Sequence, residues 1–143
     1  MKTILFLAED DPLMSRMYER AFKLSGYNTE MAFDGDEAIS KLEKIEELPT
    51  VILLDIMMPK QNGFDVLKHI KNSDKLKKIP VIMLTNLAGQ EDAEKALSMG
   101  AVLYLVKSQY DPKEIVNKIE EIVKASSRDD GVPNVKVEVK NLE

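Results

Sequence analysis

Cysteine is absent from the 143-residue chain, and its absence excludes several kinds of site. Without cysteine the chain has no disulfide, no thiolate metal centre and no cysteine nucleophile, and the composition fits a reducing compartment. Histidine occurs once, as His69, on the polar side of an expected helix. With no ligand partner beside it, we expect an exposed histidine rather than a metal ligand.

Long apolar runs are also missing. No stretch approaches the ~18 residues of a membrane-spanning helix. The first residues, MKTILFLAEDD, are apolar only from 4 to 8 before three acids follow, which is too short for a signal peptide. We therefore expect a soluble, cytoplasmic protein that does not associate with a membrane.

Glycine-rich phosphate-binding loops are lacking as well. Neither GxGxxG nor GxxxxGK[ST] occurs, so the chain has no sequence motif for binding a dinucleotide or a nucleoside triphosphate. Any phosphoryl group must then come from a partner or a small donor. The formal net charge of −5 argues against a dedicated nucleic-acid surface, which needs a basic field.

The composition that remains is that of one globular domain with a tail. The chain is 44% hydrophobic and 31% charged, enough for a core and a soluble surface. We expect the domain to cover residues 1–126. Residues 127–143 begin with Ser, Asp, Gly and Pro, which mark a linker, and then alternate valine with charged residues. This tail is expected to be a linker whose short strand-like segment either pairs with a sheet edge, of its own or of a second copy, or stays mobile. No DNA-binding helix pair is expected in it.

Five strands alternate with five helices in the hydrophobic pattern. Four compact apolar runs predict buried strands, at residues 3–8, 51–55, 80–85 and 101–106, and a mixed run predicts an edge strand at 27–33. Helical periodicity falls at residues 12–25, 36–47, 64–72, 90–99 and 111–125. Such alternation predicts a doubly wound α/β fold, a parallel sheet with helices on both faces. In open sheets of this kind the active crevice lies at the carboxyl ends of the strands.

Polar residues follow several of these strands. The sequence EDD at 9–11 follows the first, Asp55 ends the third, Thr85 ends the fourth and Lys107 follows the fifth. If the carboxylates of Asp10, Asp11 and Asp55 meet, they repel one another unless a cation joins them. An all-oxygen donor set with few protein ligands suits Mg²⁺. Carboxylates, a metal, a lysine and a threonine are the groups that phosphoryl transfer requires, and a carboxylate can itself be the nucleophile.

The same residues carry a family resemblance. EDD at 9–11, LLDIMMPKQNG around Asp55, Thr85 after IPVIML, Tyr104 in the fifth strand and Lys107 all occur in order. Over residues 2–125 the sequence resembles a receiver domain of two-component response regulators, of the single-domain chemotaxis (CheY-like) type. The resemblance implies a flavodoxin-like (βα)5 sandwich with strand order 2-1-3-4-5.

The resemblance also implies roles around the acceptor. Asp55 would be the phosphoacceptor. The Mg²⁺ ligands would be Asp10, Asp11, Asp55 and the backbone carbonyl of Met57. The donor would be a phosphohistidine on a sensor histidine kinase or a phosphotransfer protein. The Met57 side chain would overhang the site and influence how fast water removes the phosphate.

Three further positions would complete the switch. Lys107 would pair with Asp55 and then with its phosphate, Thr85 would bond the phosphate, and Tyr104 would swing inward behind it. The family usually has proline directly after the lysine, often with a cis peptide, whereas Ser108 stands here. Because a cis bond without proline costs ~2.5–4 kcal/mol, residues 107–111 are expected to follow a different path.

Each of these residues also has a purely structural interpretation, which the sequence leaves open. Asp55 fits a turn at a strand end, Asp10 and Asp11 fit caps of the helix that begins at Pro12, Thr85 and Tyr104 fit strand packing, and Lys107 fits a solvated surface.

Two helices bear on partner binding. Helix 90–99 has a thin apolar face of Ala93, Ala96 and Leu97, so it should be held loosely and shift on phosphorylation. This would change the surface of helix 90–99, strand 101–106 and helix 111–125, where a downstream target or a second copy binds. Helix 12–25 has an expected core row, Leu13, Met17, Ala21 and Leu24, and a second row, Met14, Tyr18 and Phe22, that either docks a kinase helix or widens the core.

The expected function is thus a phosphoaccepting signalling switch, and not an enzyme beyond self-catalysed phosphorylation and slow autodephosphorylation. Two alternatives remain. One is a Mg²⁺-dependent phosphatase with an aspartyl-phosphate intermediate, although such enzymes often place a second aspartate where Met57 stands. The other is a receiver-like binding module that never takes phosphate, although such modules often lack one of the acids or the lysine.

Overall fold

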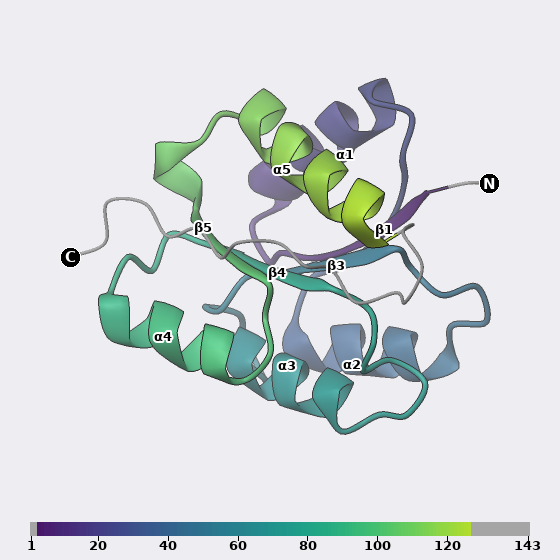
Figure 1. Cartoon of the computed structure of the whole chain (residues 1–143), viewed down its shortest axis with the longest axis vertical. Coiled ribbons are helices and arrows are strands. Elements are labelled where there is room, and N and C mark those ends of the chain that lie inside the picture. The colour runs from purple at the N-terminus through teal and green to yellow at the C-terminus, as the bar shows by residue number, and fades with distance from the viewer. Residues whose placement is uncertain (1–2, 127–143) are drawn as a thin grey trace.

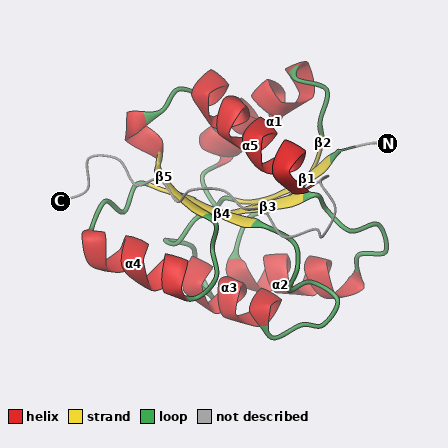
Figure 2. Cartoon of the chain, viewed as in Figure 1, coloured by secondary structure: helices red, strands yellow, loops and turns green. Residues whose placement is uncertain are grey.

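A computed structural model describes residues 3–126, and these form a five-stranded sheet with helices on both faces (Figures 1 and 2). The strands are β1 (Ile4–Ala8), β2 (Asn28–Ala32), β3 (Val51–Leu54), β4 (Val81–Thr85) and β5 (Leu103–Val106). The helices are α1 (Pro12–Leu24), α2 (Gly35–Lys44), α3 (Gly63–Lys71), α4 (Gln90–Ser98) and α5 (Pro112–Ser126), with a short 3-10 turn, η1, at Lys107–Gln109. All neighbouring strands pair in parallel, in the order β2-β1-β3-β4-β5. The predicted fold class and strand order are confirmed.

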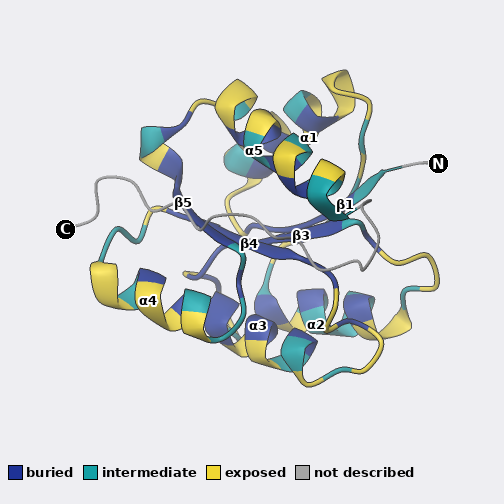
Figure 3. Ribbon diagram, viewed as in Figure 1, coloured by how far each residue is buried: buried dark blue, intermediate teal, exposed yellow. Residues whose placement is uncertain are grey.

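Two apolar cores lie on opposite faces of the sheet. Helices α1 and α5 cover one face, and α2, α3 and α4 cover the other (Figure 1). Successive residues of a strand point to opposite faces, so in β3 Ile52 packs under the three helices while Leu53 packs under the two. The central strands are buried throughout, as the dark ribbons of Figure 3 show. Burial on both faces explains why these strands read as continuous apolar runs.

Side-chain caps fix where several helices begin. In α3 the Asn62 side chain accepts from the Asp65 N–H, and the Asp65 carboxylate accepts from the Asn62 N–H. Helix α5 begins in the same way, because Asp111 and Glu114 exchange the same pair of bonds at 2.8 and 3.0 Å. These bonds satisfy N–H groups that have no partner within the helix, and they place the first turns at the carboxyl edge of the sheet.

Helix α1 turns a different row inward from the one predicted. Leu13 and Leu24, expected in the core, are 76% and 80% exposed, whereas Tyr18 and Phe22 are fully buried and stack with ring centroids 6.0 Å apart. The expected core row was therefore wrong for Leu13, Met17 and Leu24, whereas Ala21 does pack against the core. The two rows are adjacent on the helix, and the one with the larger aromatic side chains removes more apolar surface from water between the sheet and α5. The exposed row is Leu13, Met17 and Leu24.

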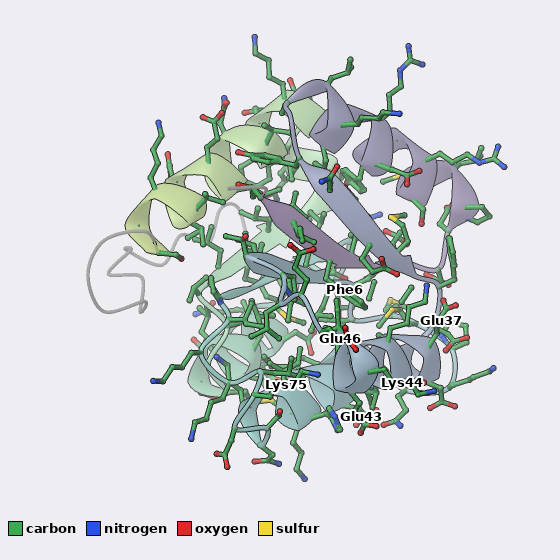
Figure 4. All side chains as sticks on the ribbon, turned by 90° about the vertical axis from the view of Figure 1, so that its right-hand side faces the viewer. Phe6, Glu37, Glu43, Lys44, Glu46 and Lys75 are labelled. Carbon is green, nitrogen blue, oxygen red and sulfur yellow. The ribbon has the colours of Figure 1, made fainter. Side chains whose placement is uncertain are left out.

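Two contacts of Glu43 join the last turn of α2 to α3 and to the loop that follows α3. Helix α2 ends at Lys44, before the expected residue 47, and Lys75 Nζ donates to the Glu43 carbonyl oxygen at 2.9 Å (Figure 4). That carbonyl belongs to the last turn, where helical partners are missing. His69 of α3 lies 3.2 Å from the Glu43 carboxylate, so the histidine that we expected to be exposed is partly buried in an ion-pair geometry.

The predicted tail at residues 127–143 lies outside the described residues. Among residues 3–126, no helix combines the length and the apolar character needed to cross a membrane.

Candidate functional site

A pocket of about 260 Å³ opens at the carboxyl edge of the sheet, between the ends of β1, β3, β4 and β5. We call it the acidic pocket. It is lined by Glu9, Asp10, Asp11, Met14, Asp55, Met57, Thr85, Asn86 and Lys107. The structure thus brings together every residue predicted for the site except Tyr104.

Asp55 follows β3 directly and is 6% exposed. Its Oδ2 lies 2.7 Å from Lys107 Nζ, and its Oδ1 accepts from the Met57 N–H at 3.3 Å. A buried carboxylate without a partner is strongly unfavourable. The ammonium group of Lys107 supplies the opposite charge, and this explains why an acid can stand at the end of an apolar strand.

Glu9 is a site residue that the sequence analysis did not assign. It is buried, and its carboxylate bonds the ammonium group of Lys107 and the Asp11 N–H, the latter at 3.1 Å. Its backbone also continues the sheet, because the Glu9 N–H donates to the Ala32 carbonyl and Ser15 Oγ donates to the Glu9 carbonyl. The extended backbone after β1 turns this side chain inward. A glutamate directly after a buried strand was the signal that could have identified it.

Lys107 joins the two buried acids. Burial acts to lower the pKa of its ammonium group, but hydrogen bonds to Asp55 and Glu9 outweigh burial and hold the pKa above its usual range. The lysine is therefore charged, with Asp55 and Glu9 on either side of it.

Three carboxylates form the group that could hold a metal ion. Ligand oxygens of Glu9, Asp10 and Asp55 lie within 4.8 Å of one another. Asp11 is not in this group, because its Oδ1 accepts from the N–H groups of Leu13 and Met14 and caps α1. Asp10 of the predicted pair thus lies in this group together with Glu9, and the role of Asp11 as a metal ligand stays a prediction. Helix α1 begins at Pro12, and this start places Asp11 at the cap.

The loop between β4 and α4 is held on both sides of Leu87. Thr85 Oγ1 accepts from the Leu87 N–H at 3.2 Å, and the Tyr104 hydroxyl donates to the Leu87 carbonyl at 2.5 Å. Tyr104 is 1% exposed, and burial raises the pKa of its hydroxyl to about 12. Its ring already lies inward in this structure, in the position that we had expected only after phosphorylation.

The backbone after Lys107 forms the 3-10 turn η1. Residues 3–126 contain no cis peptide bond, as expected for serine in place of proline. The Ser108 N–H donates to Oδ1 of Asn86, a residue of the pocket lining, at 3.1 Å. Met57, which is 65% exposed, also lines the pocket, and its carbonyl as a metal ligand stays a prediction.

Fold and pocket together define a class of protein. It is a flavodoxin-like α/β protein with acidic residues, a threonine and a lysine gathered at the carboxyl ends of parallel strands. The family model of the response regulator receiver domain matches residues 5–120, and the chain belongs to this family. Receiver domains are phosphoacceptor signalling proteins rather than conventional enzymes.

Individual relatives agree with that assignment. The chain is 32% identical to the transcriptional regulatory protein CpxR of Escherichia coli K12 over 141 residues, which cover 94% of this chain and 58% of CpxR. It thus spans little more than half of that relative. The Francisella response regulator 1452 receiver domain superposes with a TM-score of 0.79 at 27% identity, covering 88% of this chain and 100% of that one. CheY from a CheX–CheY–BeF3–Mg²⁺ complex of Borrelia burgdorferi superposes with a TM-score of 0.77 at 26% identity, covering 84% and 88%.

Proposed function

We propose that the chain is a phosphoaccepting switch of a two-component system, with Asp55 as the acceptor. The observation that carries the proposal is the contact of Lys107 with both Asp55 and Glu9 in a pocket open to the surface. The receiver unit is residues 1–126, and residues 127–143 are a tail. We place the protein in the cytoplasm, where a sensor histidine kinase or a phosphotransfer protein presents a phosphohistidine.

Four residues of the pocket have direct tasks in the transfer and in the state that follows it. An oxygen of Asp55 attacks the phosphorus atom, the phosphorus–nitrogen bond of the donor histidine breaks, and the imidazole leaves with the electron pair and takes a proton. Lys107 neutralises charge on the phosphoryl oxygens as they approach. The Thr85 hydroxyl leaves the Leu87 N–H and bonds a phosphoryl oxygen. The exposed Met57 side chain limits the approach of water to the product.

The acidic pocket fits Mg²⁺. Three carboxylates from Glu9, Asp10 and Asp55 present ligand oxygens close together, and oxygen donors are what Mg²⁺ prefers. We assign these three as ligands, with the Met57 carbonyl as a fourth and Asp11 as a helix cap. When bound, Mg²⁺ supplies positive charge that neutralises the acids and the incoming phosphoryl group. The Borrelia CheY complex, which contains Mg²⁺ and BeF3, supports the assignment.

The output surface is formed by α4, β5 and α5. Only Ala93 and Ala96 of α4 are fully buried, so little apolar area holds this helix. When Thr85 leaves Leu87, Leu87 loses one of the two hydrogen bonds that hold it in the loop before α4. The resulting shift of α4 changes the surface that a downstream target or a second copy of the chain binds.

The two alternative functions have less support. A phosphatase of repeated turnover would need a second acid or base to activate water, and the position two residues after Asp55 holds Met57. A binding module without phosphorylation leaves the lysine and the acids of the pocket without a task. No residue of the pocket favours either alternative.

Intact mass spectrometry tests the proposed function. With acetyl phosphate and Mg²⁺, we expect the protein to gain the mass of one phosphoryl group, and we expect Asp55→Asn, which keeps the shape of the side chain, to gain none. Rapid phosphate release over many turnovers would favour the phosphatase, and an unchanged mass would favour the binding module.

Amide exchange of the phosphorylated protein should rise in α4 and in the loop before it, and identical exchange there would contradict the proposed output surface.

The exposed row of α1 is the place where we expect the donor protein to dock. Leu13 and Met17 are exposed on α1, and Met14 and Met57 line the neighbouring pocket. Leu13→Glu with Met17→Glu should slow transfer from the donor protein roughly tenfold or more, because two apolar contacts are lost. Phosphorylation by acetyl phosphate, which needs no docking, should be unchanged. Equal rates from the protein donor would exclude this face. Leu48→Glu, also exposed but at the far edge of the sheet, is the matched control.

A further inference from the structure

The backbone of Ser108 and the side chain of Asn86 form a hydrogen bond between two loops. The Ser108 N–H donates to Asn86 Oδ1 at 3.1 Å, between loops that lie 22 residues apart in the sequence. A proline at position 108 would have no N–H and could not make this bond. The hydrogen bond therefore requires a residue other than proline at position 108, where this sequence departs from the family pattern.

The contact lies beside the residues that would act on the phosphoryl group. Ser108 follows Lys107, Asn86 follows Thr85, and both Asn86 and Lys107 line the acidic pocket. The Lys107 carbonyl also accepts from the Tyr110 N–H at 3.4 Å. The peptide group between Lys107 and Ser108 is thus held at its oxygen and at its nitrogen. Holding this peptide group restricts the direction in which the lysine side chain leaves the backbone.

We propose that Asn86 is a positioning residue for phosphoryl transfer. Through its bond to Ser108 it orients the backbone that carries Lys107, so that the ammonium group stands between Glu9 and Asp55 before the donor arrives. Asn86 takes over the restraint that a proline ring would exert after the lysine. The inference rests on the proposed function, because it assigns Asn86 a part in the same reaction.

A plainer interpretation is that Asn86 is an ordinary turn residue. Asparagine is frequent in turns because its side chain bonds the backbone two residues further on. Here the side-chain oxygen instead bonds the backbone of a separate loop, 22 residues further along the chain. Since Ser108 presents a donor, the atom that faces it is the amide oxygen, so the orientation of the Asn86 amide is determined by this contact.

The test measures how fast acetyl phosphate phosphorylates the protein. In this reaction an Asp55 oxygen attacks the phosphorus, the phosphorus–oxygen bond to acetate breaks, and acetate leaves. We expect Asn86→Ala to lower the maximum rate by roughly threefold to tenfold, the factor that corresponds to one neutral hydrogen bond. The Mg²⁺ dissociation constant, measured by calorimetry, should be unchanged, because Lys107 does not bind the metal. Amide exchange at Ser108 should become faster.

A double-mutant cycle separates positioning from general loosening of the pocket. In the Ser108→Pro background the N–H is gone, so Asn86→Ala should have no further effect on the rate. Asn72→Ala, which removes an exposed amide at the far end of α3, is the matched control and should react like the wild type. If Asn86→Ala slows the reaction equally in both backgrounds, or in neither, the positioning role is wrong. If the wild type itself takes no phosphoryl group, the proposed function fails.

Discussion

Lys107→Ala should lower the rate of Asp55 phosphorylation by acetyl phosphate roughly 10²- to 10³-fold. This is the factor typical of removing one preorganised donor from a reacting centre. The lysine is the partner of both Asp55 and Glu9, so its loss removes the one ammonium group that contacts both buried carboxylates among residues 3–126. The approaching phosphoryl oxygens then lack the positive charge that Lys107 supplies. Rates from intact mass spectrometry at saturating Mg²⁺ and acetyl phosphate would measure the effect.

Two controls separate this loss from unfolding. Lys77→Ala removes a lysine whose ion pair with Asp74 lies on the surface, and its rate should equal that of the wild type. Lys107→Arg keeps the charge but replaces a compact ammonium with a planar guanidinium, so it should recover little of the rate. Far-UV circular dichroism would show that each variant is folded. A Lys107→Ala protein that reacts at the wild-type rate would contradict the role of the lysine.

Gly63→Ala should lower the free energy of unfolding by about 3 kcal/mol, the upper range for overpacking a tightly filled site. A Cβ atom at Gly63 would lie 2.3 Å from the Asp55 carbonyl oxygen and 2.8 Å from the Ile56 Cα. Both contacts are with backbone, so neither can be relieved by rotating a side chain. The first turn of α3 must move away from β3, or the backbone of Asp55 must shift. Urea unfolding would measure the loss as a lower transition midpoint.

Gly89→Ala is the matched control for this glycine. A Cβ atom there meets the Asp92 carboxylate at 3.1 Å, which is the end of a flexible, half-buried side chain. The residue has φ −75°, which alanine adopts without strain. We expect the free energy of unfolding to change by less than about 1 kcal/mol. Equal destabilisation by the two substitutions would show that the close approach at Gly63 does not limit the fold.

The fold could be predicted from the sequence because its strands and helices differ in hydrophobic period. Strands such as Val51–Leu54 are apolar at every position, and the helices between them are apolar on one side. For α1 this signal was ambiguous, because Leu13 and Tyr18 belong to two adjacent apolar rows. The hydrophobic period shows how wide the apolar face of the helix is, but not which of the two rows points into the core. That orientation is set by the space between the sheet and α5, which the period of α1 does not reveal.

The site was predictable to within one residue at its acidic end. Asp55, Thr85 and Lys107 each end or follow a strand, so their meeting at one edge follows from a parallel sheet. Among the three consecutive acids after β1, the choice depended on where the strand ends and the helix begins. The bond from the Glu9 N–H to Ala32 prolongs the pairing by one residue beyond β1, and Asp11 becomes the helix cap. Assigned helix ends vary by one or two residues, and here one boundary decided which acids lie close enough to Asp55 to share a metal ion.

The double attachment of Leu87 has a practical consequence for observing the switch. Its N–H bonds Thr85 and its carbonyl bonds Tyr104, so release of either bond alters the surroundings of the next residue, Ala88. Because the chain has no cysteine, Ala88→Cys would give a single thiol for attaching a fluorescent dye. Such a dye would report on the loop from outside the pocket. The protein could then serve as its own optical sensor, with emission following the state of Thr85 in real time.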